Sequence, residues 1–324
     1  MDPIRASLPP GAPAVETRPG LAAAVAAVLA EAQGLEAPAP AAAVVAARSE
    51  AAGRQASLAP VLANLERALG SPAVPAAVKA AIGQVLALQT PTDAPITAET
   101  LKQAVSRSGL FREARLASGE PAPMDLKAAL LTLQQVLAPT TPRAANRPQR
   151  PGPPPPTPGG ALSGQAPAAA TLDADAEPAV LVHHLRGDVE QALARQTLHQ
   201  LASLPDGPGA HWMFELPLAT PQGPAVAQFA IDREDTRGAD PDGPAAWQAR
   251  FSLDIPPLGP VHVSLRMDGE RTAVTLWAEE PGSLERLRSR GGELAGVLAG
   301  DVVFRTGSPR PSEPPPGRLV DRRS

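Results

Sequence analysis

The sequence predicts an α+β fold: a small C-terminal domain of antiparallel strands with one or two packed helices, preceded by a largely disordered Ala/Pro-rich region with short helices. Seven of the eight Phe and Trp residues lie between residues 212 and 304, so we expect one compact core there. Beyond residue 205 the hydrophobic pattern changes from a helical period to strict alternation, which is typical of half-buried strands. The chain also has 41 prolines, well above the usual share of roughly 5%.

Composition argues against one large globule, although the chain has 324 residues. Apolar residues make up 43% of it, but only 2% are aromatic and Ala supplies most of the rest. An Ala side chain removes little surface from water, whereas a buried Leu or Phe contributes roughly 1.5–3 kcal/mol. The hydrophobic fraction therefore overstates the size of the core.

Charge and cysteine content exclude several classes of protein. The net charge is −4 with acidic and basic residues mixed, so no basic field attracts nucleic acid. The chain has no cysteine, which excludes a disulfide framework and thiolate zinc sites.

One apolar run near the N-terminus, LAAAVAAVLA at 21–30, is too short to span a bilayer and predicts an ordinary helix. Glu16 and several prolines precede it without a basic cluster, which argues against a signal peptide. We therefore expect no membrane insertion, and export by a route other than the general one if the protein leaves the cytoplasm.

Changes in composition and periodicity predict five parts of the chain. They are a disordered region at 1–56, a helical and partly ordered segment at 57–138, a Pro-rich linker at 139–178, a C-terminal domain at 179–306 with its core at 205–306, and a disordered tail at 307–324. The linker contains eleven prolines, including PGPPPPTP at 151–158, which favours extended polyproline conformation.

Helical periodicity is clearest at 57–138, where apolar residues recur at i, i+3 and i+4. Two such stripes are Leu58, Val61, Leu62, Leu65 and Leu69, and Val74, Val78, Ile82 and Val85. Helices at 97–108 and 125–137 begin at the capping residues Thr97 and Asp125, and the first ends at Gly109. These segments form either a small Ala-rich bundle or partly ordered hairpins. A further helical stripe covers 179–204.

Alternation predicts the strands of the C-terminal domain. In WQARFSLDI at 247–255 the apolar residues alternate with polar ones, and VHVSLRM at 261–267 repeats the pattern. Asp268 and Gly269 supply a two-residue turn, so 259–280 predicts a hairpin with Val274, Leu276 and Ala278 toward the core. A second hairpin is expected from 211–218 and 225–232, and then a helix at 282–299 and a strand at 301–305.

These C-terminal elements resemble, in order and spacing, the C-terminal domain of flagellar hook-length control proteins. The resemblance runs from Trp247 through Gly300: WQARFSLDI, a Pro257-Leu258-Gly259 turn, VHVSL, Gly269, VTLWAE, and a Leu-rich helix. The segment LKQAVSRSGLFREARLA at 101–117, followed by DLKAALLTLQQVL at 125–137, is similar to a segment ahead of the linker in some long members of this family.

The resemblance implies a non-enzymatic protein that is cytoplasmic before export and is then secreted through the flagellar type III apparatus. Its extended N-terminal part, through contacts with hook or hook-cap subunits, would act as a molecular ruler. Its C-terminal domain would bind the export-gate switch protein and change substrate specificity from hook to filament proteins. A stretch of about 170 residues spans on the order of 560 Å when extended and about 250 Å when helical. We expect a monomer that takes no cofactor.

The resemblance and the strand pattern give one set of candidate residues for partner binding or the domain motif: Trp247, Pro257, Leu258, Gly259, Val261, Val263, Leu265, Gly269, Val274, Leu276, Trp277, Glu279, Leu287 and Leu294. Trp247 and Trp277 are either core residues alone or also part of a contact surface. Pro257-Leu258-Gly259 is at least a turn, with a partner contact as the further hypothesis.

Other functions lack a supporting motif. The five histidines show neither i, i+4 spacing on one helix face nor a completing carboxylate, and no nucleotide loop or nucleophile elbow occurs. Glu279 and Glu280 point to opposite faces of a strand, which argues against a catalytic pair. The alternative is a Pro-rich, envelope-spanning structural or adaptor protein. That class requires a membrane anchor, so cell fractionation distinguishes it from an exported regulator.

Overall fold

The computed structural model describes residues 40–121, 123–138, 153–204, 210–234, 246–268, 271–298 and 300–309. The chain divides into two compact units, Met1–Ala46 and Ala47–Ser324. The described part of the first unit is the start of helix α2 (Pro40–Arg54). The predictions for 1–39, for the 310–324 tail and for the Gly269 turn lie outside the described residues. None of the helices in the described ranges is both long and apolar enough to cross a membrane.

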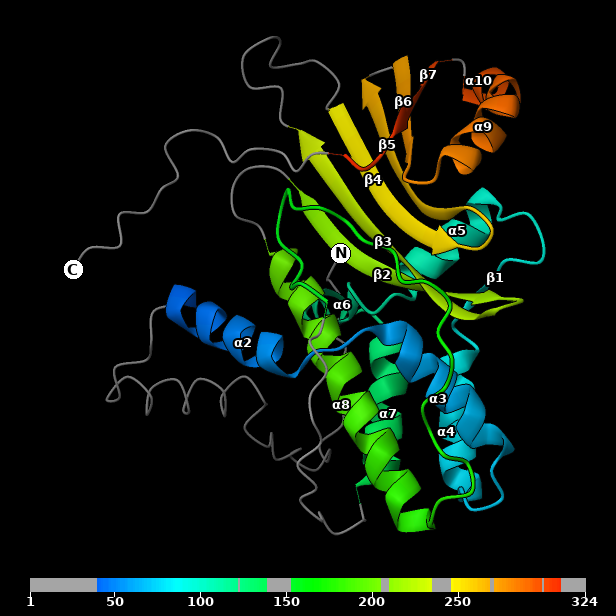
Figure 1. The fold of residues 1–324 in the computed structure, drawn as a ribbon. Coiled ribbons are helices and arrows are strands. Elements are labelled where there is room, and N and C mark those ends of the chain that lie inside the picture. Colours follow the sequence, from blue (N-terminus) through cyan, green and yellow to red (C-terminus); the bar gives the residue numbers. More distant parts are fainter. Residues whose placement is uncertain are drawn as a thin grey trace, which may run out of the picture. The chain divides into compact units, whose positions relative to one another are not determined.

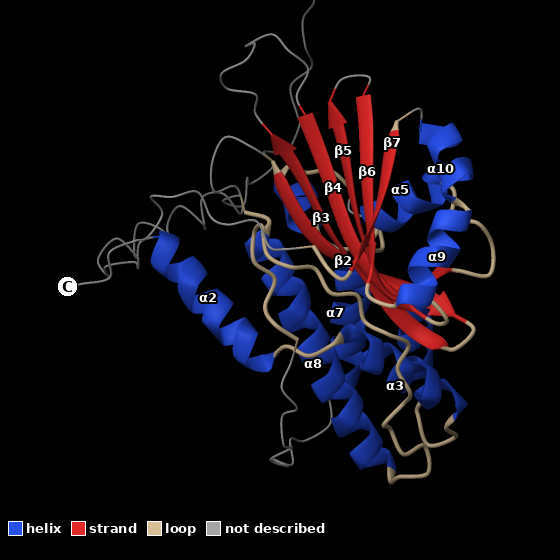
Figure 2. Ribbon diagram, turned by 45° about the horizontal axis from the view of Figure 1, so that its top comes forward, coloured by secondary structure: helices blue, strands red, loops and turns tan. Residues whose placement is uncertain are grey.

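The second unit contains a seven-stranded sheet whose strands follow one another in chain order (Figure 2). The strands are β1 (Thr90–Pro91), β2 (His211–Thr220), β3 (Gly223–Glu234), β4 (Ala246–Ile255), β5 (Gly259–Asp268), β6 (Arg271–Ala278) and β7 (Asp301–Thr306). Neighbours from β2 to β6 are antiparallel, while β1 and β7 add parallel strands at the two edges. The predicted α+β class is confirmed, with mixed rather than purely antiparallel pairing.

The two predicted hairpins are confirmed by the strand register. Phe214 pairs with Phe229 in β2–β3, and Val263 pairs with Leu276 in β5–β6. Asp268, which was predicted as a turn residue, instead ends β5 and pairs with Arg271. Since side chains alternate across a strand, the register gathers most of the aromatic and branched residues of β2 to β7 on one face, with Trp277 among the exceptions. We call this side the apolar face of the sheet.

A second core lies beside the sheet and is formed mainly by α3 (Leu58–Gly70), α4 (Ala76–Leu86), α7 (Leu126–Leu137) and α8 (Pro178–Ala202) (Figure 1). The shorter helices α5 (Ala98–Ser106) and α6 (Arg112–Ala117) contribute no buried residue to it. The fully buried side chains of this core include Leu62, Ile82, Leu133 and Leu185 from α3, α4, α7 and α8. The helical stripes therefore pack as a bundle in the structure.

Both predicted N-caps are confirmed. The side chain of Thr97 accepts a hydrogen bond from the amide of Thr100, and that of Asp125 accepts one from the amide of Ala128. Such caps satisfy amides that have no partner inside the helix.

The single helix predicted at 282–299 is wrong. The structure has two short helices, α9 (Pro281–Ser289) and α10 (Gly291–Leu298), with Arg290 in a non-helical conformation between them. Gly291 and Gly292 follow at once, and glycine is a poor helix former. Their low helix propensity outweighs the continuous leucine pattern from which one helix was expected.

Residues 153–176, which we call the strap, cross from the helices to the sheet. Backbone hydrogen bonds join Gln165 to Val226 of β3 in both directions, and Leu162 and Leu172 are buried. Gly164 lies so close to β4 that an added Cβ would come within 2.5 Å of the Leu253 Cα. The strap lies within the predicted Pro-rich linker at 139–178. The predicted domain boundaries stay predictions.

Candidate partner-binding site

Most candidate residues of β5 and β6 lie on the apolar face of the sheet. Val261 and Val263 of β5 pack in a cluster with Leu284 and Leu287 of α9, together with Leu258 and Phe304. Val274 and Leu276 of β6 are buried on the same side. Leu265 pairs with Val274 and is half-buried. These residues form the core of the domain, so they stabilise it rather than offer a surface to a partner.

The Pro257-Leu258-Gly259 turn connects β4 to β5 and is exposed at its prolines. The amide of Leu258 donates a hydrogen bond of 2.8 Å to the Ile255 carbonyl, and the Leu258 side chain packs on the α9 cluster. Gly259 has a φ of 66°, the left-handed region that glycine adopts readily. The turn thus has a half-buried anchor, Leu258, and an exposed apex.

A hollow of 420 Å³ lies between this turn and the start of α9. Its lining consists of Pro256, Pro257, Gly259, Glu280, Gly282, Ser283 and Arg286. The Arg286 guanidinium donates a hydrogen bond of 3.3 Å to the Pro257 carbonyl. Rigid prolines, one cation and one carboxylate therefore meet at an accessible end of the sheet.

Trp277 and Glu279 lie on the opposite face from the apolar cluster. Trp277 pairs with His262 across the β5–β6 ladder and is half-buried. His262 Nε2 lies 3.0 Å from Glu279 Oε1. Burial and the nearby negative charge of Glu279 raise the pKa of Asp254 above its usual value. This polar group adjoins the turn from the other side of the sheet.

Trp247 lies at the far end of β4, away from the turn. Its indole stacks on Trp212 with ring centroids 5.8 Å apart, and the Arg233 guanidinium lies 5.8 Å from its ring centroid. Leu294 of α10 is half-buried, and Gly269 lies outside the described residues. The structure therefore brings the turn, β5, β6 and α9 together, whereas Trp247 pairs with Met267 at the end of β5 far from the turn.

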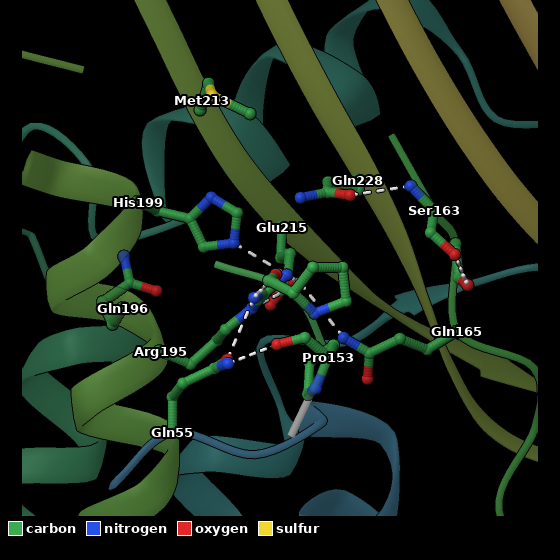
Figure 3. Close-up of polar contacts among 12 residues, drawn as sticks. Gln55, Pro153, Ser163, Gln165, Arg195, Gln196, His199, Met213, Glu215 and Gln228 are labelled. Carbon is green, nitrogen blue, oxygen red and sulfur yellow. Dashed lines mark hydrogen bonds and ion pairs between the residues drawn. The ribbon is translucent and has the colours of Figure 1, made fainter. Parts of the chain in front are cut away.

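A second site, which the sequence did not predict, is the buried ion pair of Arg195 on α8 and Glu215 on β2 (Figure 3). The Arg195 Nε and Nη2 atoms donate hydrogen bonds of 3.0 and 2.8 Å to Glu215 Oε1. Gln165 Nε2 donates to the same oxygen at 3.0 Å, and His199 Nε2 lies 3.4 Å from it. The Glu215 side chain is only 2% exposed.

The ion pair also holds the strap. Arg195 Nη1 donates hydrogen bonds of 3.0 Å to Gln55 Oε1 and 2.9 Å to the Pro154 carbonyl, and the Gln55 amide group donates to the Pro153 carbonyl. Figure 3 shows Gln55, Arg195, Glu215 and Gln165 converging from different parts of the chain. A helix, a strand and the strap are thus joined at one point.

The charges of this site are matched. Burial alone would raise the pKa of Glu215, but the adjacent Arg195 guanidinium and then His199 outweigh it and lower the pKa to about 2. A carboxylate so firmly ionised is a poor proton donor or acceptor near neutral pH. The arrangement suits a structural clamp. The one sequence signal was a glutamate in the middle of the apolar strand HWMFELPL.

In the described part of the chain, no group of three or more His, Asp or Glu side chains is placed to hold an ion.

One family model matches the chain, described as Flg_hook, Flagellar hook-length control protein FliK, over residues 235–303. The C-terminal region carries a hook-length control domain. The resemblance predicted from Trp247 through Gly300 is thereby confirmed. No curated protein and no solved structure matches the chain.

The hook-length control match covers β4, β5, β6, α9 and α10 and ends within β7. It therefore contains the Pro257-Leu258-Gly259 turn and the hollow beside it. Arg195, Glu215 and the strap lie before the match. The matched family is a non-catalytic flagellar regulatory domain with export-related partners and an association with the bacterial flagellum. The roles of the individual candidate residues stay predictions.

Proposed function

We propose that this protein controls flagellar hook length as an exported ruler, and that its C-terminal domain binds the type III export gate. Binding there switches export from hook to filament proteins. The match of residues 235–303 to the hook-length control family carries this proposal. The match coincides with a folded set of strands and helices, which supports a domain that acts by binding.

The contact with the switch protein is proposed at the β4–β5 turn and the start of α9. Pro256 and Pro257 are exposed, whereas Val261, Val263 and Ala278 of β5 and β6 are committed to the core. Rigid prolines cost little conformational entropy on binding. Arg286 adds a cation at the rim of the 420 Å³ hollow.

Length sensing is proposed for the Ala/Pro-rich region ahead of the domain, through contacts with hook or hook-cap subunits during export. The absence of cysteine supports passage through a narrow channel, because no disulfide would have to be reduced.

The test uses a flagellated strain that relies on variants of this chain. Deletion of residues 205–306 should give over-long hooks without filaments, and normal filaments in that strain would contradict the proposal. Arg286→Glu should lengthen hooks and reduce filaments, whereas Arg67→Glu on α3, with the same change in charge, should leave both normal. Equal effects of the two variants would reject the proposed contact surface.

A further inference from the structure

The amphipathic helix α5 has no fully covered apolar side. Neither α5 nor the short helix α6 contains a buried residue. Four of the ten exposed large hydrophobic side chains in the described ranges fall between residues 96 and 124: Ile96, Leu101, Leu116 and Met124. Exposed apolar side chains scattered singly need no explanation, but a local concentration indicates an interaction site.

A hollow of 450 Å³ opens between these two helices. It is lined by Ala98, Leu101, Lys102, Val105, Ser106, Phe111 and Arg115. Leu101, which is 40% exposed, Val105 and Phe111 supply its apolar surface. The hollow lies on a different part of the chain from the hook-length control match, which begins at residue 235.

The floor of the hollow is anchored to the rest of the fold. Phe111 meets the Trp212 ring edge to face, with centroids 6.0 Å apart. The preceding residue, Leu110, is buried with Phe214 and Leu216 of β2. From α8, Gln196 Nε2 donates a hydrogen bond of 2.9 Å to the Ser108 carbonyl. A ligand would meet a preformed surface, which lowers the entropic cost of binding.

Both charged residues that line the hollow are cations. Lys102 and Arg115 line it, and no carboxylate is among the described lining residues. The nearest acidic side chain of α6, that of Glu113, is engaged by Lys127 and Gln200. Arg115 also donates a hydrogen bond of 3.4 Å to the Ser106 carbonyl, which holds it at the rim.

We propose that the α5–α6 hollow binds a short, acidic amphipathic segment of a partner protein. Apolar anchors of that segment would pack on Leu101, Val105 and Phe111, and its carboxylates would lie near Lys102 and Arg115. Helix-in-groove recognition uses anchors at i, i+3, i+4 and i+7, and complementary charge fixes orientation and partner choice. This site is independent of the proposed contact with the export gate.

The preference for an acidic segment is tested with two fluorescein-labelled helical peptides. Both carry Leu at positions i, i+3, i+4 and i+7, and the other positions carry Glu in one peptide and Lys in the other. Fluorescence anisotropy on the full chain should show saturable binding of the Glu peptide, about tenfold tighter than the Lys peptide at low salt. Lys102→Glu should weaken binding of the Glu peptide about five- to tenfold. The control Arg67→Glu should weaken that binding less than about twofold. Equal affinity for both peptides would overturn the proposal.

The apolar component is tested with two leucines of similar exposure on different helices. Leu101→Gln should weaken the Glu peptide about tenfold, whereas Leu69→Gln on α3, where Leu69 is 37% exposed, should not. Circular dichroism confirms that each variant is folded. Unchanged affinity in a folded Leu101→Gln protein would overturn the proposal. So would concentration-dependent self-association that Leu101→Gln abolishes, because the surface would then belong to a second copy of this chain.

Discussion

The two halves of the sheet are stabilised in different ways. On β5 to β7 the contacts to α9 are apolar, and the one described ion pair at the turn, His262 with Glu279, has a 45% exposed carboxylate. At β2 the contact with α8 depends on the buried pair of Arg195 and Glu215. An apolar cluster follows from the alternation within its strands, whereas a buried ion pair requires partners that are distant in sequence.

Breaking the buried ion pair should have the largest effect. Arg195→Met leaves the Glu215 carboxylate buried without its cation, and should lower the free energy of unfolding by about 3–5 kcal/mol. Urea denaturation followed by circular dichroism measures the loss. The control Arg195→Met/Glu215→Leu should recover most of it, because no charge is then left uncompensated. If the double variant is as unstable as Arg195→Met alone, the loss of stability comes from lost packing and not from an uncompensated charge.

The same pair predicts a dependence of stability on pH. The pKa of Glu215 is lowered from 4.5 to about 2 in the folded state. The group thus contributes its full stabilisation, on the order of 3 kcal/mol, above the unfolded pKa. This contribution is lost as the pH falls from about 4.5 through 2. Urea midpoints across this range should fall less steeply in the double variant, and parallel curves would contradict the assignment to Glu215.

A cavity in the apolar half should cost somewhat less and leave the pH dependence unchanged. Leu284 of α9 is 4% exposed in the cluster with Val261 and Ala278. Leu284→Ala should therefore lower the free energy of unfolding by about 2–3 kcal/mol. Calorimetry at pH 7 and pH 4 should give the same loss at both values, and a loss confined to one pH would mean that α9 packing is coupled to a charge.

The contact of buried His262 with the half-exposed Glu279 should contribute least. Glu279→Gln should change the free energy of unfolding by less than about 1 kcal/mol, because water screens the 45% exposed carboxylate. It should also lower the pKa of Asp254 toward its usual value, since the charge of Glu279 helps to raise it. NMR titration measures that pKa. An unchanged pKa would leave burial as the sole cause.

Local features of this fold were predictable from the sequence. The caps Thr97 and Asp125 act within one helical turn, and the inward positions Val274, Leu276 and Ala278 follow from alternation. The exact register of this hairpin was missed, because Asp268 was expected in the turn and instead pairs with Arg271. The break at Arg290 was missed because the leucine pattern of 282–299 continues across it.

Features that depend on tertiary contacts were not predictable in the same way. Ser252 was expected on the polar side of β4, yet it is 1% exposed because the strap covers it and the Gly164 amide donates to its hydroxyl. The candidate site was only partly predictable for the same reason. Alternation identified Val261 and Val263 as inward residues, but not that their contacts with Leu284 and Leu287 would leave the turn beside them exposed. Glu215 was missed because nothing near it in sequence indicates that Arg195 is its partner.

The central structural claim is that the strap joins the helices to the sheet as one folded unit. Side chains of Asn64, Gln228 and Ser252 accept hydrogen bonds from strap amides, including those of Thr171, Ser163 and Gly164. Hydrogen exchange by mass spectrometry on the full chain tests it most directly. Strap amides should exchange as slowly as those of β3, and Arg195→Met should accelerate them. Exchange of residues 153–176 at the rate of an unstructured chain would contradict the claim.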